Sequence, residues 1–228
     1  MAKFRITAAP KTTIARAMIG ATVLASAFTA HATSQAYAET VEQPIIAADD
    51  HAGVQAPKAD ETKVNVTAAQ VLALARSQVG TTENAAGGGT PYQQWYAASQ
   101  RAAETIARDG GERAAYLNAP WCAMFISWLG EKTGARPTVG WDAYTVTYAK
   151  WFRANNRFGT LAKPGAVVFF SWSGSKDLRD INHVGMVVKD NQNGTISTIE
   201  GNTGNGRVEE RIRPTSQVVG YGYPQYAA

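Results

Sequence analysis

The periodicity of the apolar residues changes once along the chain, near residue 163. Before that point, apolar side chains recur at intervals of three and four residues, as on one face of an α-helix. After it, short runs rich in Val, Ile, Phe and Thr are bounded by Gly, Asn and Pro, which is typical of β-strands. Helices followed by strands predict an α+β domain in which N-terminal helices pack on an antiparallel sheet, because parallel strands would need helices between them.

The same patterns predict where each element lies. Helices are expected over residues 68–79, 91–108, 118–134 and 141–155, and strands over 166–172, 183–189, 195–200, 207–213 and 218–223. The third helix is apolar on several faces, so we expect it to be central and largely buried. The fourth has an aromatic stripe, which we interpret as core rather than as a cofactor site.

The first 66 residues differ in composition from the rest. Residues 1–38 have a basic start, an apolar run and an Ala-Tyr-Ala end, which together predict a signal peptide. The apolar run is too short for a membrane anchor, which needs about 20 residues. Residues 39–66 are acidic and rich in Ala and Pro, and they predict a disordered linker. Residues 67–228 are predicted to form one folded domain.

The charge is unevenly distributed along the chain. The formal net charge of +4 comes from the four basic residues of the predicted signal peptide, and the remainder has 18 basic and 18 acidic residues. From Lys63 onward the balance is +5, which fits either a mild attraction to polyanions or an ordinary soluble surface. No nucleic-acid-binding motif or run of basic residues occurs, so no nucleic-acid partner is expected.

Cys122 is the only cysteine, so the chain has no intramolecular disulfide. Asn118 can cap the helix that contains it, and Pro120 is tolerated in a first turn. A thiol at a helix N-terminus lies at the positive end of the macrodipole, which favours the thiolate. Cys122 is therefore a candidate nucleophile; the alternative is a small buried apolar residue.

His183 is the only histidine of the predicted domain, because His31 lies in the signal peptide and His51 in the linker. One cysteine and one histidine are too few for a zinc site, which takes three or four ligands, so no metal is predicted. A thiol and an imidazole suit nucleophilic catalysis.

Four motifs occur in the order found in a known family. They are Trp121-Cys122-Ala-Met-Phe-Ile-Ser-Trp, Pro164-Gly165-Ala-Val-Val-Phe-Phe, His183-Val-Gly-Met-Val and Ile199-Glu200-Gly-Asn202-Thr. Over roughly residues 68–226 the chain resembles the CHAP domains (cysteine, histidine-dependent amidohydrolase/peptidase), papain-like enzymes that cut peptidoglycan. It differs in having Ala166 where members often have Asp, and in lacking a carboxylate-rich calcium loop.

The resemblance implies a papain-like fold with the nucleophile at the N-terminus of the central helix. It implies that Cys122 is the nucleophile, His183 the general base, Glu200 the residue that orients the imidazole, and Asn202 a further polar member of the site. Without the resemblance, Glu200 and Asn202 would be interpreted as a strand end and a turn. The predicted substrate-binding residues are Trp121 and Trp172. No cofactor is predicted.

The predicted function is that of a secreted cysteine peptidoglycan hydrolase. We expect an extracellular monomer, free or associated with the cell wall, that is not inserted in a membrane once the signal peptide is removed. The sequence leaves open whether the bond is an N-acetylmuramoyl-L-alanine amide or a peptide bond, and whose wall is cut. The alternative from another class is a surface-binding or signalling module without catalysis on the same fold.

The register of the predicted hairpin decides which side chains meet His183. A four-residue loop places Glu200 opposite Gly185, and a six-residue loop places it opposite His183. In both cases His183, Glu200 and Asn202 share one face, and we expect the start of the Cys122 helix to pack on that face over Gly185. A five-residue loop without a bulge would send them to opposite faces.

Overall fold

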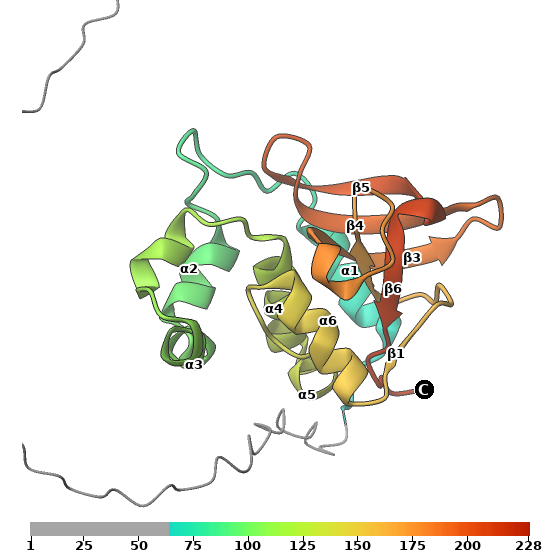
Figure 1. The fold of residues 1–228 in the computed structure, drawn as a ribbon, viewed down its shortest axis with the longest axis horizontal. Helices are drawn as coiled ribbons and strands as arrows, with labels where there is room; N and C mark the ends of the chain where they lie inside the picture. The colour runs from blue at the N-terminus through green and yellow to red at the C-terminus, as the bar shows by residue number, and fades with distance from the viewer. Residues whose placement is uncertain (1–63) are drawn as a thin grey trace, which may run out of the picture. The chain divides into compact units, whose positions relative to one another are not determined.

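The structure is a computed structural model, and it describes residues 64–228. The predicted signal peptide and nearly all of the predicted linker lie outside these residues. The described part is an α+β fold with six α-helices followed by an antiparallel sheet, as predicted (Figure 1). The helices are α1 Ala68–Ser77, α2 Pro91–Ala98, α3 Gln100–Asp109, α4 Cys122–Thr133, α5 Arg136–Val139 and α6 Thr145–Ala154. No helix within residues 64–228 has the length and apolar character that crossing a membrane requires.

The folded region includes residues that the sequence assigned to the linker. Val64 and Val66 are buried, and the N–H of Ala227 donates to the carbonyl of Val66 at 2.9 Å. Residues 64–66 therefore pack with the domain instead of belonging to a disordered segment. The predicted cap of α1 is confirmed, since Thr67 and Gln70 form a reciprocal capping box.

The prediction of one helix over residues 91–108 was wrong. Ser99 has an extended backbone and separates α2 from α3, while its side chain accepts the N–H of Ala102 and so caps α3. A serine in a helical pattern can end one helix and begin the next because its hydroxyl replaces a backbone acceptor. The spacing of apolar residues over 91–108 is the same for two consecutive helices as for one continuous helix, so it did not reveal the break at Ser99.

Helix α4 is central, as its apolar faces predicted. It contacts α2 on one side and two strands of the sheet on the other (Figure 1). Phe125, Ile126 and Leu129 are fully buried. The helix ends at Gly134, which adopts the left-handed conformation with φ of 77°. Its expected cap by Asn118 was wrong, because a 3₁₀ turn over Arg113–Leu117 precedes the helix and α4 begins at Cys122 itself.

The sheet has six strands in the order β1-β6-β2-β3-β4-β5, and all neighbours are antiparallel. The strands are β1 Phe158–Gly159, β2 Val167–Phe170, β3 His183–Asp190, β4 Thr195–Thr203, β5 Arg207–Pro214 and β6 Val218–Gly222. Five coincide with predicted strands. The sixth, β1, has two residues, too few to show an alternating pattern.

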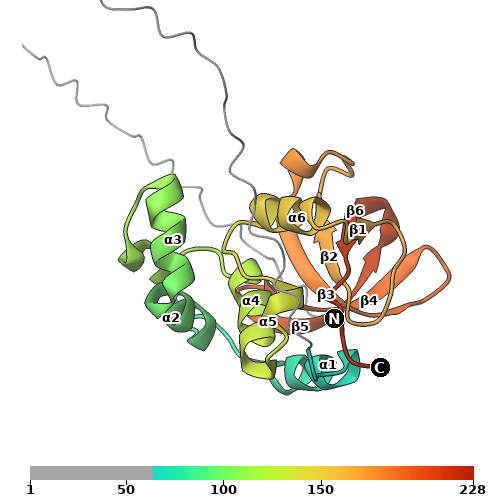
Figure 2. The same ribbon diagram turned by 90° about the horizontal axis from the view of Figure 1, so that it is seen from below.

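The helices cover one face of the sheet. Helix α4 packs on β3 and β4, and α6 packs on β1 and β6, while Figure 2 shows α6 and α1 at opposite ends of the sheet. The aromatic stripe of α6 is core, as predicted, because Tyr148 and Phe152 are buried and both contact Phe169 of β2. The opposite face has a smaller apolar cluster that includes Val168, Phe170, Val187 and Ile196. We refer to this second side as the outer face.

The register of the β3–β4 hairpin combines a five-residue loop with a β-bulge. Asp190 pairs with Ile196 near the turn, whereas Met186 pairs with Ile199 farther along, and the shift occurs between Val187 and Lys189. One extra residue in β3 thus compensates for the odd loop length. Beyond the bulge the register is that of the four-residue alternative, which places Glu200 opposite Gly185.

The expected position of α4 was wrong in one respect. His183 alternates with Val184 and lies on the outer face, whereas Val184 belongs to the cluster that packs against the helices. The start of α4 packs closely on the sheet at Gly201, where a Cβ would lie 2.7 Å from the ring of Trp121 and 2.8 Å from Cβ of Phe125. Gly185 instead leaves room for the side chain of Glu200, since a Cβ there would lie 2.7 Å from its Cγ.

Candidate active site

Cys122 is the first residue of α4 and is 6% exposed. The N–H groups of the first helical turn have no acceptor within the helix, so those of Cys122 and Ala123 are directed toward the same end as the thiol. The preceding N–H, that of Trp121, donates to Oδ1 of Asn202 at 3.1 Å. The helix start therefore combines a thiol with backbone donors that can bind an anion.

His183 is the first residue of β3, and this places its imidazole at the end of the sheet nearest the start of α4. Its Nε2 lies 2.9 Å from Oε2 of Glu200. The imidazole is also hydrogen bonded to Cys122, and Nδ1 is the ring nitrogen left for that contact. The structure thus brings together the three residues predicted to be closest to the chemistry.

Burial of His183 lowers the pKa of the imidazole, because a charge is less stable away from water. Hydrogen bonds to Cys122 and Glu200, and the negative charges of both residues, outweigh this effect and raise the pKa to about 9. At neutral pH the imidazole is therefore protonated. A positive imidazolium beside the thiol favours the thiolate.

Glu200 is fully buried, yet it is ionised. Burial raises the pKa of the carboxyl, but hydrogen bonds from Arg213, His183 and Thr198 lower it to about 2. Nε of Arg213 lies 2.9 Å from Oε1, and Oγ1 of Thr198 lies 2.6 Å from the same oxygen. Arg213 and Thr198 therefore hold the carboxylate against the imidazole.

Arg213 was missed by the sequence analysis. It lies on β5, and its guanidinium also lies 4.9 Å from the ring of Trp172, which in turn lies 5.1 Å from the ring of His183. Trp172 is 41% exposed and covers the imidazole and the guanidinium from one side. The sequence around an arginine in a strand does not indicate which carboxylate it will pair with, because that depends on the register between its strand and the neighbouring one.

An Arg213→Met variant is expected to be less stable than the native protein by roughly 3 kcal/mol at pH 7, because it leaves the Glu200 carboxylate buried without its cation. The lowered pKa of Glu200 means that its stabilising contribution is complete above the unfolded-state pKa of 4.5 and is lost as the pH falls toward about 2. The stability difference should therefore shrink across that range. Urea unfolding at several pH values measures it, with Arg213→Lys as the charge-conserving control. A constant difference down to pH 2 would contradict the ionised state of Glu200.

Asn202 lies at the site but does not share the regular face of His183 and Glu200. A register shift between Glu200 and Thr203 interrupts β4 there, and Asn202 has φ of 55°. Its Nδ2 donates to Glu83 at 3.2 Å, in addition to the bond that its Oδ1 accepts from the helix start. Asn202 therefore holds the start of α4, and the predicted placement beside the imidazole on one face was wrong.

The side chain of Trp121 cannot form the surface that a substrate contacts. It is fully buried, stacks on Tyr92 at 5.3 Å, and its Nε1 donates to Glu83 at 2.8 Å. Its prediction as a substrate-binding residue was wrong, because its ring, one position before α4, packs in the core against Tyr92. Glu83 was missed, since it lies in a loop 38 positions away from Trp121.

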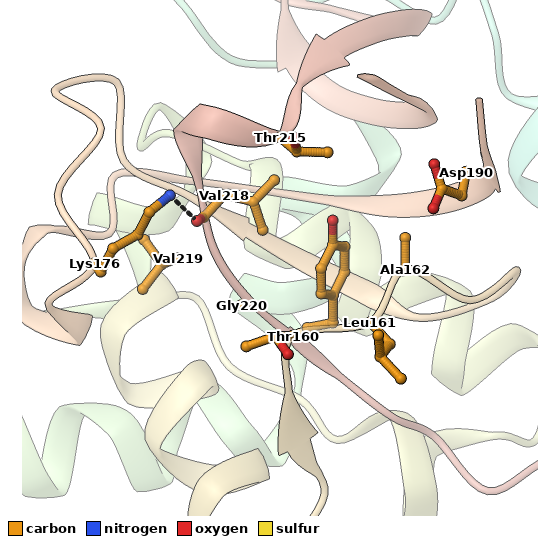
Figure 3. Close-up of a pocket in the computed structure, with 10 residues that line it drawn as sticks. Thr160, Leu161, Ala162, Lys176, Asp190, Thr215, Val218, Val219 and Gly220 are labelled. Atoms are coloured by element: carbon orange, nitrogen blue, oxygen red, sulfur yellow. Dashed lines mark hydrogen bonds between the residues drawn. The ribbon is translucent and has the colours of Figure 1, made fainter. Parts of the chain in front are cut away.

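The described chain has a cleft at the thiol and a larger cavity elsewhere. The cleft of about 230 Å³ includes Cys122, and the cavity of about 550 Å³ lies beside β6 and the segment after β1 (Figure 3). The larger one contains none of the predicted site residues. Its Lys176 donates to the carbonyls of Ser216 and Val218, the latter drawn in Figure 3, so this amine holds a loop in place. The cleft at Cys122 is the candidate site.

A thiol, an imidazole and a carboxylate in this order are the groups that cysteine- and histidine-dependent hydrolases use. The family model for the CHAP domain matches residues 114–202. These residues thus match the CHAP domain, a family of peptidoglycan-related amidases and peptidases, as the motifs predicted. The match includes Cys122, His183, Glu200 and Asn202, and it ends before Arg213. A search of curated proteins and a search of solved structures found no match.

Proposed function

We propose that this protein is a cysteine peptidoglycan hydrolase that cleaves an amide bond of the wall peptide. The observation that carries the proposal is that the only thiol of the chain contacts the imidazole of His183, which a buried, ionised Glu200 holds in place. The CHAP family match supports the substrate class. A cysteine at the start of a helix beside a histidine of the sheet supports the papain-like arrangement that we propose.

The reaction has two halves. The Cys122 thiolate attacks the carbonyl carbon of the amide, and the resulting oxyanion accepts hydrogen bonds from backbone N–H groups at the start of α4, including that of Cys122. The C–N bond then breaks as the His183 imidazolium gives its proton to the leaving amine. In the second half, neutral His183 takes a proton from water, the hydroxide attacks the thioester, and the thiolate of Cys122 leaves.

Glu200 and Arg213 act on the imidazole and not on the substrate. The carboxylate accepts from Nε2, which leaves Nδ1 for the thiol and the leaving amine, and it stabilises the imidazolium. Arg213 keeps that carboxylate ionised and in position. Trp172, exposed beside the imidazole, is the substrate-binding residue that we retain as a proposal.

Export is part of the proposal and depends on residues 1–38. Cleavage before Glu39 would release an extracellular protein, free or bound to the wall, and its substrate is found there. Digestion of purified peptidoglycan, with identification of the new termini by mass spectrometry, tests the activity and shows which amide is cut. Intact peptidoglycan after prolonged incubation would favour the non-catalytic binding module.

The thiol is expected to react quickly with iodoacetamide because the helix start and the imidazolium favour the thiolate. At pH 7 its alkylation should be faster than that of glutathione. Mass spectrometry of the intact protein gives the rates, and His183→Gln, which removes the imidazolium, is the control that should react more slowly. Alkylation slower than that of glutathione would identify Cys122 as an ordinary buried residue.

A further inference from the structure

We infer that the cavity beside β6 is a second binding site and that its ligand is a primary ammonium group on an aliphatic chain, such as the side chain of a diamino acid. The volume of this cavity, about 550 Å³, lies within the range of about 300–1,000 Å³ that is usual for small-molecule sites. Its wall is largely apolar and includes Leu161, Ala162, Val218 and Val219 (Figure 3). Such a wall suits an aliphatic chain, so the polar groups beside it decide which ligand binds.

Asp190 places a negative charge at one side of the cavity. Its Oδ1 accepts the N–H of Gln192 at 2.8 Å, whereas its Oδ2 has no hydrogen-bond or ion-pair partner among residues 64–228. Figure 3 shows the other charged residue of the lining, Lys176, across the cavity from Asp190. The Nζ of Lys176 donates to the carbonyls of Ser216 and Val218 at 2.7 and 2.6 Å. The carboxylate of Asp190 is therefore left for a cationic ligand.

Tyr221 of β6 provides a second polar atom near this carboxylate. The residue is only 3% exposed, yet its hydroxyl has no hydrogen-bond partner in the part of the chain that the structure describes. Burial raises the pKa of Tyr221 to about 12, and the charge of Asp190 contributes to this rise, so the hydroxyl is neutral at pH 7 and lies near the carboxylate. Buried hydroxyls without a partner are uncommon in native proteins. An ammonium group can donate to this oxygen and to Asp190 while its chain packs on the apolar wall.

The cavity lies on the same side of the sheet as the active site. Val218 and Tyr221, which line it, belong to the apolar cluster of the outer face, and His183 lies on that face. Strand β3 runs from His183 to Asp190, so the imidazole and the carboxylate are roughly 20 Å apart along it. A polymer held at Asp190 can place another of its segments at the thiol. The free side-chain amine of a diamino acid in the wall peptide would be such an anchor. This last step rests on the proposed function, whereas the binding of an amine does not.

Titration of the native protein with Nα-acetyl-lysine N-methylamide tests the binding of an amine, because this probe has a primary ammonium and no carboxylate. We expect saturable shifts in the backbone amide NMR signals of Leu161, Val219 and Gly220. The matched control probe is also acetylated at Nε, which removes the charge, so it should bind at least about tenfold more weakly. Equal affinity for the two probes, or no saturable shift of these signals, would overturn the inference.

Variants of the two polar groups locate the ammonium. Asp190→Asn removes the charge and keeps an oxygen that can accept the N–H of Gln192, so the turn should remain. It should weaken binding of the lysine probe by about tenfold, and Tyr221→Phe should weaken it by about fivefold. Glu112→Gln removes one negative charge near the 3₁₀ turn before α4 and should leave the affinity unchanged. Native affinity in Asp190→Asn would contradict the pairing of the ligand with this carboxylate.

Purified peptidoglycan, before and after chemical acetylation of its free amines, tests whether the wall supplies the ligand. For the native enzyme we expect acetylation to raise KM by about fivefold with little change in kcat, because the amine binds far from the reacting atoms. For Asp190→Asn the two preparations should have the same KM. An unchanged KM for the native enzyme would show that the ligand of this cavity is an amine from another source. If neither preparation is cut, the proposed function is wrong, and the titrations still decide whether the cavity binds an amine.

Discussion

Hydrolysis of purified peptidoglycan by a Cys122→Ala variant is expected to fall by at least roughly 1,000-fold, because the bond-forming atom is absent and no other thiol can replace it. Alanine is smaller than cysteine and fits the same helix position, so the fold should remain intact. Release of soluble wall fragments by the native protein and by the variant measures the loss.

The control for this result is Cys122→Ser, which keeps the size of the side chain and replaces the nucleophile with a much weaker one. It should be nearly as inactive as the alanine variant while binding peptidoglycan as the native protein does. A Cys122→Ala protein that kept the native rate of hydrolysis would refute the mechanism. One that kept the full biological effect without hydrolysis would identify a binding or signalling module.

A Glu200→Gln variant is expected to lose on the order of 10² to 10⁴ in kcat, because a neutral amide neither fixes the imidazole tautomer as the carboxylate does nor stabilises its cation. The pH profile should change as well. Glu200 contributes to the raised pKa of His183, so its removal lowers that pKa. The imidazolium is present only below its own pKa, and the alkaline limb of kcat/KM, near pH 9 in the native enzyme, should move to lower pH.

Two further variants distinguish the loss of imidazole orientation by Glu200 from a general disturbance of the active site. Asn202→Ala should reduce turnover less than Glu200→Gln does, and it should leave the alkaline limb in place, because Asn202 contacts the start of α4 and not the imidazole. Arg213→Met should move the acid limb to higher pH, since the pKa of Glu200 rises when its cation is lost. A fully active Glu200→Gln enzyme with an unchanged pH profile would remove Glu200 from the site.

Much of the fold follows from local sequence. Apolar residues at helical spacing predicted the bounds of α1, α4 and α6 to within a few positions, because a helix that buries one face needs apolar side chains at that spacing. Alternation located five of the six strands, and Gly134 marked the end of α4 because a left-handed residue is easiest for glycine. Cys122 and His183 could be paired from the sequence alone because they are the only cysteine and the only histidine of the predicted domain, and the family motifs added Glu200.

Only the tertiary structure decided how these groups meet. The bulge between Val187 and Lys189 keeps Glu200 on the face of His183 despite an odd loop length, and no local pattern specifies a bulge. The role of Arg213 depends on that register and on a third strand. Trp121 and Trp172 both lie near site motifs, yet one is core and the other is exposed, because burial depends on which element packs opposite each ring. Periodicity is a property of one segment, so it can be found in the sequence. Register, ion pairing and burial arise only when two or more segments pack together, and the arrangement of the active site depends on all three.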